Sequence, residues 1–271
     1  MRAPLKAGGH RVVTTVAGRS DRTRALVAAA GVEVLESLEA VATQAEVVFS
    51  IVPPASAIEN ARTFAAAAER CGARPIFVDA NAVSAETMRS VSAAVDPAGI
   101  RLVDMCILGS SHDLERCRIY LSGKDASTLI EMLNGALVCK LLSAPIGGAS
   151  AIKMVTSGFF KGFLALFFEF AVAGAELDIL KVQLEEMARL LPETMRSIEE
   201  LAPTFQKHAS RRVDELTEVI QTIQGCGSAT TMATAARRTI ERVAKSHLGP
   251  ERGLEDIVAQ LVASGTFKES A

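Results

Sequence analysis

The sequence has no tryptophan and one tyrosine, and aromatic residues make up only 4% of its 271 residues. Hydrophobic residues nevertheless make up 49%, and alanine is abundant. A core built from small and aliphatic side chains suits helices that pack closely against a sheet. The length favours one large domain or two modest ones.

Neither sign of charge is in large excess. The formal net charge is −2 at pH 7, with 29 basic and 31 acidic residues. A chain without a strong basic surplus lacks the electrostatic footprint of general nucleic-acid binding. We therefore expect no nucleic acid among its partners.

Paired cysteine motifs are also missing. The five cysteines are scattered and form no C-x-x-C pair: Cys71, Cys106, Cys117, Cys139 and Cys226. An odd, dispersed set is typical of reduced thiols in the cytoplasm, where we expect the protein to be. Cys106, His112 and Cys117 do not have the spacing of a zinc site, so no metal is predicted.

No long apolar run is free of charges. Basic residues near the start leave no apolar stretch there, so no secretory signal is expected. The most apolar segment, residues 159–175, contains Lys161 and Glu169. This pattern favours a buried core helix over a membrane span, and no membrane association is predicted.

The first half alternates short β-branched runs with helical stretches. Strands are expected at 11–16, 32–34, 47–52, 76–79, 101–107, 118–123 and 138–142, and helices near 21–30, 37–44, 55–71, 84–95 and 125–136. This alternation predicts an α/β fold, a doubly wound and mostly parallel sheet with helices on both faces. Such strands should be apolar on both of their faces.

Strand signals end near residue 145. Residues 149–178 read as one long helix, apolar nearly all round and therefore buried on every side. Gly158 and Gly162 would let a neighbouring helix come close. Amphipathic helices are expected at 181–200, 204–224, 228–246 and 251–264. The predicted organisation is an α/β domain at 1–145 and an all-helical domain at 146–271.

In open parallel sheets, ligands bind beyond the carboxyl ends of the strands. The first such end carries Gly18, Arg19, Ser20 and Arg22 where NAD-binding domains often have an acidic residue. Basic side chains there suit the 2′-phosphate of NADP. A solvated loop that caps the following helix is an equally good interpretation.

Two further strand ends carry candidate groups. Val52 is followed by Pro53-Pro54, a rigid turn that could pass beneath a nicotinamide or ribose. An ordinary strand exit explains it as well. Asp79, Asn81 and Ser84 form a polar loop, although Ser84 with Thr87 also reads as a simple helix cap.

Lys153 lies near the start of the long apolar helix, after a Gly-Gly turn. Loss of solvent there should lower its pKa toward general acid–base use. Ser157 and Lys161 follow at successive turns of the same helix. The alternative is that Lys153 extends its ammonium group to water.

These segments together resemble the β-hydroxyacid dehydrogenase superfamily, which includes 3-hydroxyisobutyrate and 6-phosphogluconate dehydrogenases. The resemblance covers essentially the whole chain and is closest to a branch with an uncharacterised helical C-terminal domain. Six segments occur in the family's order: "AGGHRV", "VVFSIVPP", "FVDANAVSAET", "LVDMCILGS", "YLSGKDA" and "GGASAIKMVTSG".

The resemblance implies an NAD(P)-dependent oxidoreductase with a Rossmann-like domain. It assigns general acid–base catalysis to Lys153, beside Ser157. Hydride would pass between NADP(H), with NAD also possible, and a small hydroxy acid or related carbonyl or imine compound. The implied cofactor residues are Arg19, Ser20, Arg22, Val52, Pro53 and Asn81. The implied substrate residues are Asn81, Ala82, Gly109, Ser110, Lys161, His208 and Arg211. Glu215 is expected on the same helix face as His208 and Arg211. A homodimer through the helical domain is expected.

Three departures from the family pattern matter. Thr156 and Ser157 replace the asparagines of Lys-x-x-Asn-Asn, and Asn81-Ala82 replaces Ser-Thr, so the substrate cannot be carried over. The first strand and its G-x-G-x-x-G turn, which hold the pyrophosphate, are not in the printed sequence. Either the recorded start lies downstream of the true one, or a shortened chain binds cofactor weakly. A cofactor-free paralogue that dimerises or binds a ligand is the alternative function.

Overall fold

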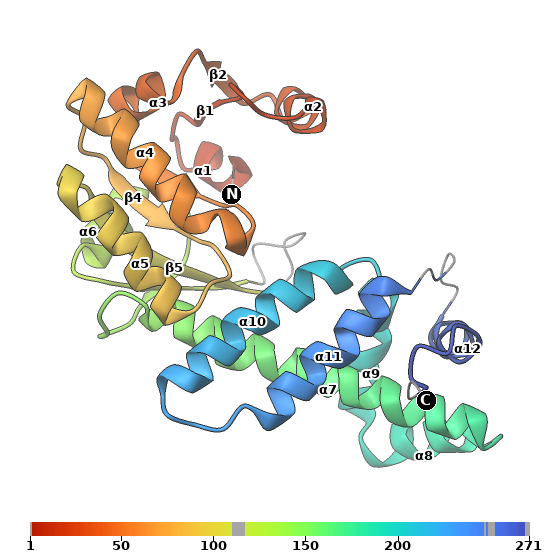
Figure 1. Cartoon of the computed structure of the whole chain (residues 1–271). Coiled ribbons are helices and arrows are strands. Elements are labelled where there is room, and N and C mark those ends of the chain that lie inside the picture. The colour runs from red at the N-terminus through yellow and green to blue at the C-terminus, as the bar shows by residue number, and fades with distance from the viewer. Residues whose placement is uncertain (1, 110–116, 247, 249–252, 269–271) are drawn as a thin grey trace. The chain divides into compact units, whose positions relative to one another are not determined.

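A computed structural model describes residues 2–109, 117–246, 248 and 253–268 (Figure 1). The chain divides into two compact units, residues 1–154 and residues 155–271. The first is an α/β unit and the second is helical, so the predicted fold class is confirmed. The long helix α7 (Gly148–Glu176) crosses the boundary, and each unit is considered by itself.

The elements of the first unit follow the predicted alternation closely. The strands are β1 (Val13–Thr15), β2 (Glu33–Leu35), β3 (Val47–Ser50), β4 (Ile76–Asp79), β5 (Arg101–Leu108), β6 (Arg118–Ser122) and β7 (Cys139–Leu141). The helices are α1 (Arg2–Ala7), α2 (Asp21–Ala29), α3 (Leu38–Gln44), α4 (Ala57–Cys71), α5 (Ala85–Val95) and α6 (Ala126–Leu133). Short 3₁₀ turns occupy Pro54–Ser56 and Asp96–Ala98.

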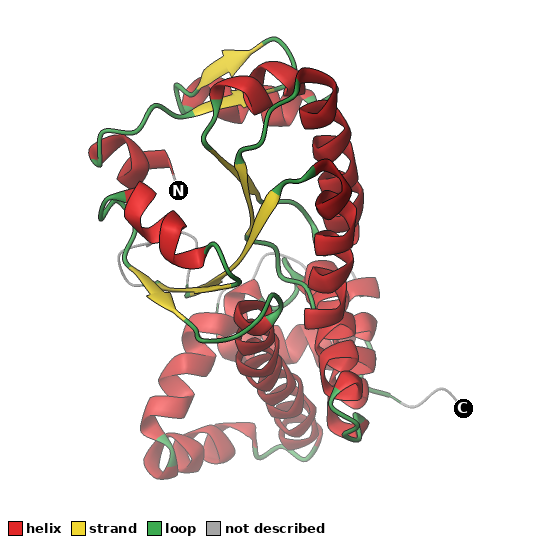
Figure 2. Ribbon diagram, turned by 90° about the vertical axis from the view of Figure 1, so that its left-hand side faces the viewer, coloured by secondary structure: helices red, strands yellow, loops and turns green. Residues whose placement is uncertain are grey.

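The strands form two sheets, whereas we predicted one. β1 and β2 pair in parallel, and a separate five-stranded sheet has the order β3-β4-β5-β6-β7 (Figure 2). β6 runs antiparallel to β5, and the other pairs of the larger sheet are parallel. Among the described residues, no strand bridges β1 and β3. In the described part of the chain, the pair β1–β2 is therefore not hydrogen-bonded to the larger sheet.

Helices cover both faces of the larger sheet, as predicted. Buried side chains of α4 and α5, such as Phe64 and Met88, pack on one face with Phe77 of β4. Leu5 of α1 and Leu129 of α6 pack on the other with Val78. The expectation that every strand is buried on both faces is wrong for β1, β2 and β7, whose residues are half-buried or exposed.

The second unit contains α8 (Leu180–Leu190), α9 (Pro192–Leu201), α10 (Ala209–Gly225), α11 (Thr231–Lys245) and α12 (Leu254–Ala263). One helix was predicted over 181–200, but the structure has two. Pro192 stands at the first position of α9, where its missing N–H costs least, and it cannot continue α8. Residues 202–204 form a 3₁₀ turn, so α10 begins five residues later than expected.

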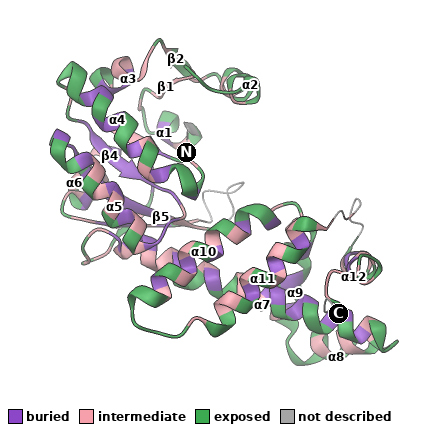
Figure 3. Ribbon diagram, viewed as in Figure 1, coloured by how far each residue is buried: buried purple, intermediate pink, exposed green. Residues whose placement is uncertain are grey.

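The prediction that α7 is buried on every side is wrong for the single chain. Phe159 is 70% exposed and Phe170 58%, although Phe168 is fully buried against Phe205, with ring centroids 4.3 Å apart. Figure 3 shows exposed as well as buried residues along α7. α7 is long and apolar enough to cross a membrane by length and composition alone, with 44% of its most apolar window buried in the protein. Core helices of soluble proteins share those properties.

Candidate active site

Lys153 lies in the second turn of α7 and is half-buried. Its Nζ donates a hydrogen bond to the carbonyl oxygen of Ile107, 3.2 Å away. Ile107 is next to last in β5, so the ammonium group lies at the carboxyl end of that strand. This is the edge of the sheet where ligands of open α/β folds bind.

The start of α7 is attached to the sheet through Asp104, a fully buried residue of β5. Asp104 Oδ2 accepts hydrogen bonds from the backbone N–H groups of Gly147 and Ser150 at 3.0 and 3.1 Å. It also accepts one from Ser122 Oγ at 2.8 Å, and Oδ1 accepts one from Ser150 Oγ at 2.7 Å. Burial raises the pKa of Asp104, although these hydrogen bonds oppose the shift.

Asn81 joins the exits of β3 and β4. Its Oδ1 accepts a hydrogen bond from Val52 N at 2.6 Å, and its Nδ2 donates to Asp79 Oδ2 at 2.8 Å and to Ser50 Oγ at 3.0 Å. Asp79 is fully buried, and mainly for that reason its pKa is raised to about 6. Two predicted cofactor residues, Asn81 and Val52, are thus in direct contact.

A cavity of about 1130 Å³ occupies the gap between β1 and β3. Gly18 and Arg19 beyond β1 line it, as do Val52 and Pro53 beyond β3. Three predicted cofactor residues, Arg19, Val52 and Pro53, are therefore gathered around one cavity. The cavity lies beyond the carboxyl ends of two parallel strands, where open α/β folds bind their ligands.

Ser20 and Arg22 are placed differently. The side chain of Ser20 caps α2 by accepting a hydrogen bond from Thr23 N at 3.3 Å. Arg22 is exposed in the first turn of α2, and neither residue lines the cavity. Ser84 likewise caps α5 through Thr87 N at 3.0 Å, as the capping interpretation predicts.

The loops after β4 and β5 carry the remaining predicted substrate residues of this unit. Ala82 is half-buried directly after Asn81. Gly109 has φ +131°, and a Cβ there would lie 2.8 Å from Cys117 Sγ, so only glycine fits. Ser110 and His112 lie outside the described residues. The described part of the chain contains no cluster of three or more residues suited to hold a metal ion.

In the helical unit, Lys161 and Arg211 both pair with Glu215. Lys161 Nζ lies 3.0 Å from Glu215 Oε2 with both side chains largely buried, and Arg211 Nε lies 3.4 Å from Oε1. His208 directly precedes α10, and burial and nearby Arg211 lower its pKa. Ser157 Oγ is buried, with no hydrogen-bond partner among the described residues. Arg211 and Glu215 of α10 thus form an i, i+4 pair, and Lys161 of α7 contacts the same carboxylate.

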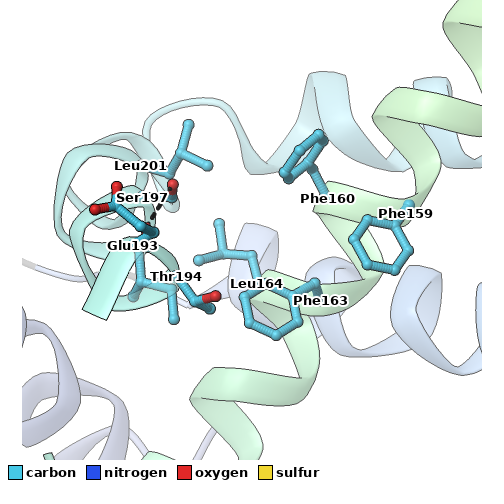
Figure 4. A pocket seen from close by; sticks show the side chains of 9 residues that line it. Phe159, Phe160, Phe163, Leu164, Glu193, Thr194, Ser197 and Leu201 are labelled. Atoms are coloured by element: carbon cyan, nitrogen blue, oxygen red, sulfur yellow. Dashed lines mark hydrogen bonds between the residues drawn. The ribbon is translucent and has the colours of Figure 1, made fainter. Parts of the chain in front are cut away.

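The same unit has a smaller apolar pocket of about 240 Å³ (Figure 4). Its walls are Phe159, Phe160, Phe163 and Leu164 of α7 and residues of α9 that include Thr194 and Ser197. The phenylalanine rings stand along one side of α7 and face α9. This pocket was not predicted, because the sequence analysis treated α7 as buried throughout.

Two family matches cover most of the chain. Residues 1–132 match the NAD binding domain of 6-phosphogluconate dehydrogenase, and residues 175–243 match a domain family of unknown function, DUF1932. A solved conserved protein of unknown function, described as structurally similar to 3-hydroxyacid dehydrogenases, is 29% identical. It aligns over 95% of this chain and 92% of its own, with a TM-score of 0.68.

The chain belongs to the β-hydroxyacid dehydrogenase superfamily. A 3-hydroxyisobutyrate dehydrogenase from Mycobacterium tuberculosis, solved with L-serine, has the same fold at 18% identity, with a TM-score of 0.70 over 96% of this chain and 93% of that one. An imine reductase from Myxococcus stipitatus, solved with NADP⁺, has 14% identity and a TM-score of 0.55 over 96% and 95%. A variant of it was solved with NAD⁺.

Membership in the β-hydroxyacid dehydrogenase superfamily makes the chain a dehydrogenase or reductase by class, with a nicotinamide-binding domain. Three buried polar residues that attach α7 to the sheet were not predicted from the sequence: Asp104, Ser122 and Ser150. The available signal was an aspartate inside an otherwise apolar strand, "RLVDMCI". A buried carboxylate there needs hydrogen-bond donors, and the start of α7 supplies them.

Proposed function

We propose that the chain transfers hydride between NADP(H) and a small hydroxy acid or a related carbonyl or imine compound. The observation that carries this proposal is Lys153, held by Ile107 at the carboxyl end of β5. In oxidation, neutral Lys153 accepts the hydroxyl proton while the carbon-bound hydrogen leaves as hydride. In reduction, the Lys153 ammonium returns that proton. The bound nicotinamide supplies the hydride-transfer chemistry.

The cavity between β1 and β3 supports a preference for NADP. Arg19 lines it beyond β1, and an arginine suits a 2′-phosphate better than a 2′-hydroxyl. Val52 N is fixed by Asn81, which also sets the direction in which the chain leaves β3. In this proposal Val52, Pro53 and Asn81 hold the ribose and nicotinamide end, and Arg19 binds the 2′-phosphate. Ser20 and Arg22 do not line the cavity, so neither is given a contact with the cofactor. NAD is the weaker cofactor.

The substrate is a small anion or polar carbonyl compound. Gly109 and Ser110 follow the strand that ends beside Lys153, and Asn81 and Ala82 follow the neighbouring strand. In the helical unit the proposed substrate residues are Lys161, His208 and Arg211, of which Lys161 and Arg211 pair with Glu215. Ser157 lies one turn beyond Lys153 on α7 and contributes a hydroxyl.

The apolar side of α7 favours a homodimer, and the scattered cysteines favour the cytoplasm. Phe159, Phe160 and Phe170 are 70%, 48% and 58% exposed in the single chain, and a second copy would remove this surface from water. Light scattering should report twice the chain mass of 28.6 kDa. A mass near that of one chain would contradict the dimer, and Phe159→Glu should convert dimer to monomer.

Thermal unfolding with increasing NADPH or NADH tests the function. A ligand that binds only the folded state stabilises it by about 2.7 kcal/mol at 100 times its dissociation constant. We expect a clear rise in Tm with NADPH and a smaller one with NADH. A folded chain that shows no shift with either would contradict cofactor binding. In that case the open gap between β1 and β3 favours the alternative, a cofactor-free binding protein.

A further inference from the structure

Strand β5 holds the start of α7 at two points. Asp104 accepts hydrogen bonds from the backbone of Gly147 and Ser150 and from the Ser150 hydroxyl. Three residues further along the strand, the carbonyl oxygen of Ile107 accepts a hydrogen bond from Lys153 Nζ. Ser150 and Lys153 are separated by one helical turn. One strand therefore fixes both the first turn of the helix and the tip of its lysine.

The N–H groups in the first turn of α7 need a partner that only accepts hydrogen bonds, such as a carboxylate. The first N–H groups of a helix have no partner within it. Gly148 N is satisfied by Pro145 O at 3.0 Å and Ala149 N by Ser122 Oγ at 3.0 Å, which leaves Ser150 N for Asp104. The Ser122 hydroxyl in turn donates to Asp104. Four donors converge on one carboxylate, which also lies at the positive end of the helix dipole.

We propose that Asp104 is the residue that positions Lys153 for proton transfer. The proposal rests on the proposed function. Without the carboxylate, the first turn of α7 loses its attachment to β5, and the Lys153–Ile107 hydrogen bond loses its fixed geometry. Catalysis is sensitive to such shifts, since a displacement of about 1 Å can cost roughly a hundredfold in rate. Asp104 acts through the helix and is not itself a proton donor or acceptor in the reaction.

Asp104→Asn is the sharpest test. The replacement keeps the shape but points an NH₂ group at N–H and O–H donors. The matched control is Asp79→Asn, the same change at the paired and equally buried position of β4. Among the described residues, the Asp79 carboxylate accepts hydrogen bonds from Asn81 and none from α7. Ser150→Ala is a milder variant that removes only the hydroxyl contact. It keeps the test usable if Asp104→Asn does not fold, as judged by circular dichroism.

The first readout does not need activity. Lys153 is dimethylated with formaldehyde and cyanoborohydride over a range of pH, and its labelling rate is measured by peptide mass spectrometry. We expect the rate at Lys153 to rise severalfold in Asp104→Asn, less in Ser150→Ala, and to stay near wild type in Asp79→Asn. An unchanged rate and pH profile in both Asp104→Asn and Ser150→Ala would overturn the proposal.

The second readout separates positioning from folding. The assay uses NADPH and a small carbonyl compound that the wild-type protein reduces. In Asp104→Asn, kcat should fall about tenfold to a hundredfold, while KM for NADPH changes less than about twofold. If the affinity for NADPH fell by as much as kcat, the variant would be damaged as a whole, and the positioning role of Asp104 would be contradicted. If Lys153→Met is as active as wild type, the proposed function fails, yet the labelling experiment still reports whether Asp104 holds Lys153.

Discussion

Asp79 and Asp104 occupy paired positions on the parallel strands β4 and β5, and both side chains are fully buried. Burial disfavours their charged forms, and the charge of Asp104 adds to the shift at Asp79. The two side chains form hydrogen bonds with different parts of the fold. Asp79 bonds to the loop that holds Asn81, whereas Asp104 bonds to the start of α7.

The raised pKa of Asp79 predicts that the free energy of unfolding falls as pH rises. Below about pH 3.8 both the folded and unfolded states are protonated. Between about 3.8 and 6 the unfolded state loses the proton while the folded state keeps it, so stability decreases; above 6 the contribution is lost and the curve levels off. The upper limit of this loss is about 3 kcal/mol, at about 1.4 kcal/mol per pH unit. Urea unfolding in steps from pH 4 to pH 7 measures it.

Asp79→Asn is the control for this prediction, since asparagine cannot titrate. The variant should have a flatter slope between pH 4 and 6, with the remainder due to Asp104 and exposed acids. The same slope in variant and wild type would show that Asp79 does not titrate in this range.

Much of this fold was predictable because local patterns decide the elements. β-branched runs marked all seven strands, and serine caps marked the starts of α2 and α5. The separation of β1–β2 from the larger sheet was harder to foresee, since strand pairing depends on contacts distant in sequence. The exposure of Phe159 was not predictable either, because apolar periodicity does not show which side of a helix the same chain covers.

The candidate site was predictable in its parts and less so in its connections. Arg19 and Pro53 follow strands in the predicted alternation, and Lys153 was singled out because it lies near the start of an apolar helix. The hydrogen bond from Val52 N to Asn81 and the convergence of donors on Asp104 depend on tertiary packing. The individual catalytic and substrate roles remain predictions.

Replacement of Lys153 by methionine should abolish turnover. Methionine keeps much of the apolar stem but cannot carry a proton, and loss of a general acid–base group typically costs about 10²–10⁴-fold in rate. Binding of NADPH, followed by the rise in Tm, should stay near wild type because Lys153 does not line the cavity between β1 and β3. Lys140→Met, at an exposed lysine of β7, serves as the control. Full activity in Lys153→Met would remove the lysine from the mechanism.

Arg19→Ala should reduce the preference for NADP. A hydrogen bond between charged partners contributes about 1.5–3 kcal/mol, so the Kd for NADPH should rise roughly tenfold or more while that for NADH changes little. Isothermal titration with both cofactors measures the ratio. Arg89→Ala, at an exposed arginine paired with Glu86 on α5, should leave both constants unchanged. Equal weakening of NADPH and NADH by Arg19→Ala would contradict recognition of the phosphate.

Gly158 of α7 should be required for close packing against α10. A Cβ at this position would lie 2.7 Å from Cγ1 of Val219, which is buried and, as a β-branched residue, has little rotamer freedom. Alanine favours a helix over glycine by about 1 kcal/mol, but overpacking costs about 1–3 kcal/mol, so Gly158→Ala should be neutral to destabilising by about 2 kcal/mol. In a Val219→Ala background the obstacle is removed, and the same change should stabilise the protein by about 0.5–1 kcal/mol. Urea unfolding of the wild type, the two single variants and the double variant gives the coupling energy directly. Equal effects of Gly158→Ala in both backgrounds would show that α7 and α10 do not meet at these two residues.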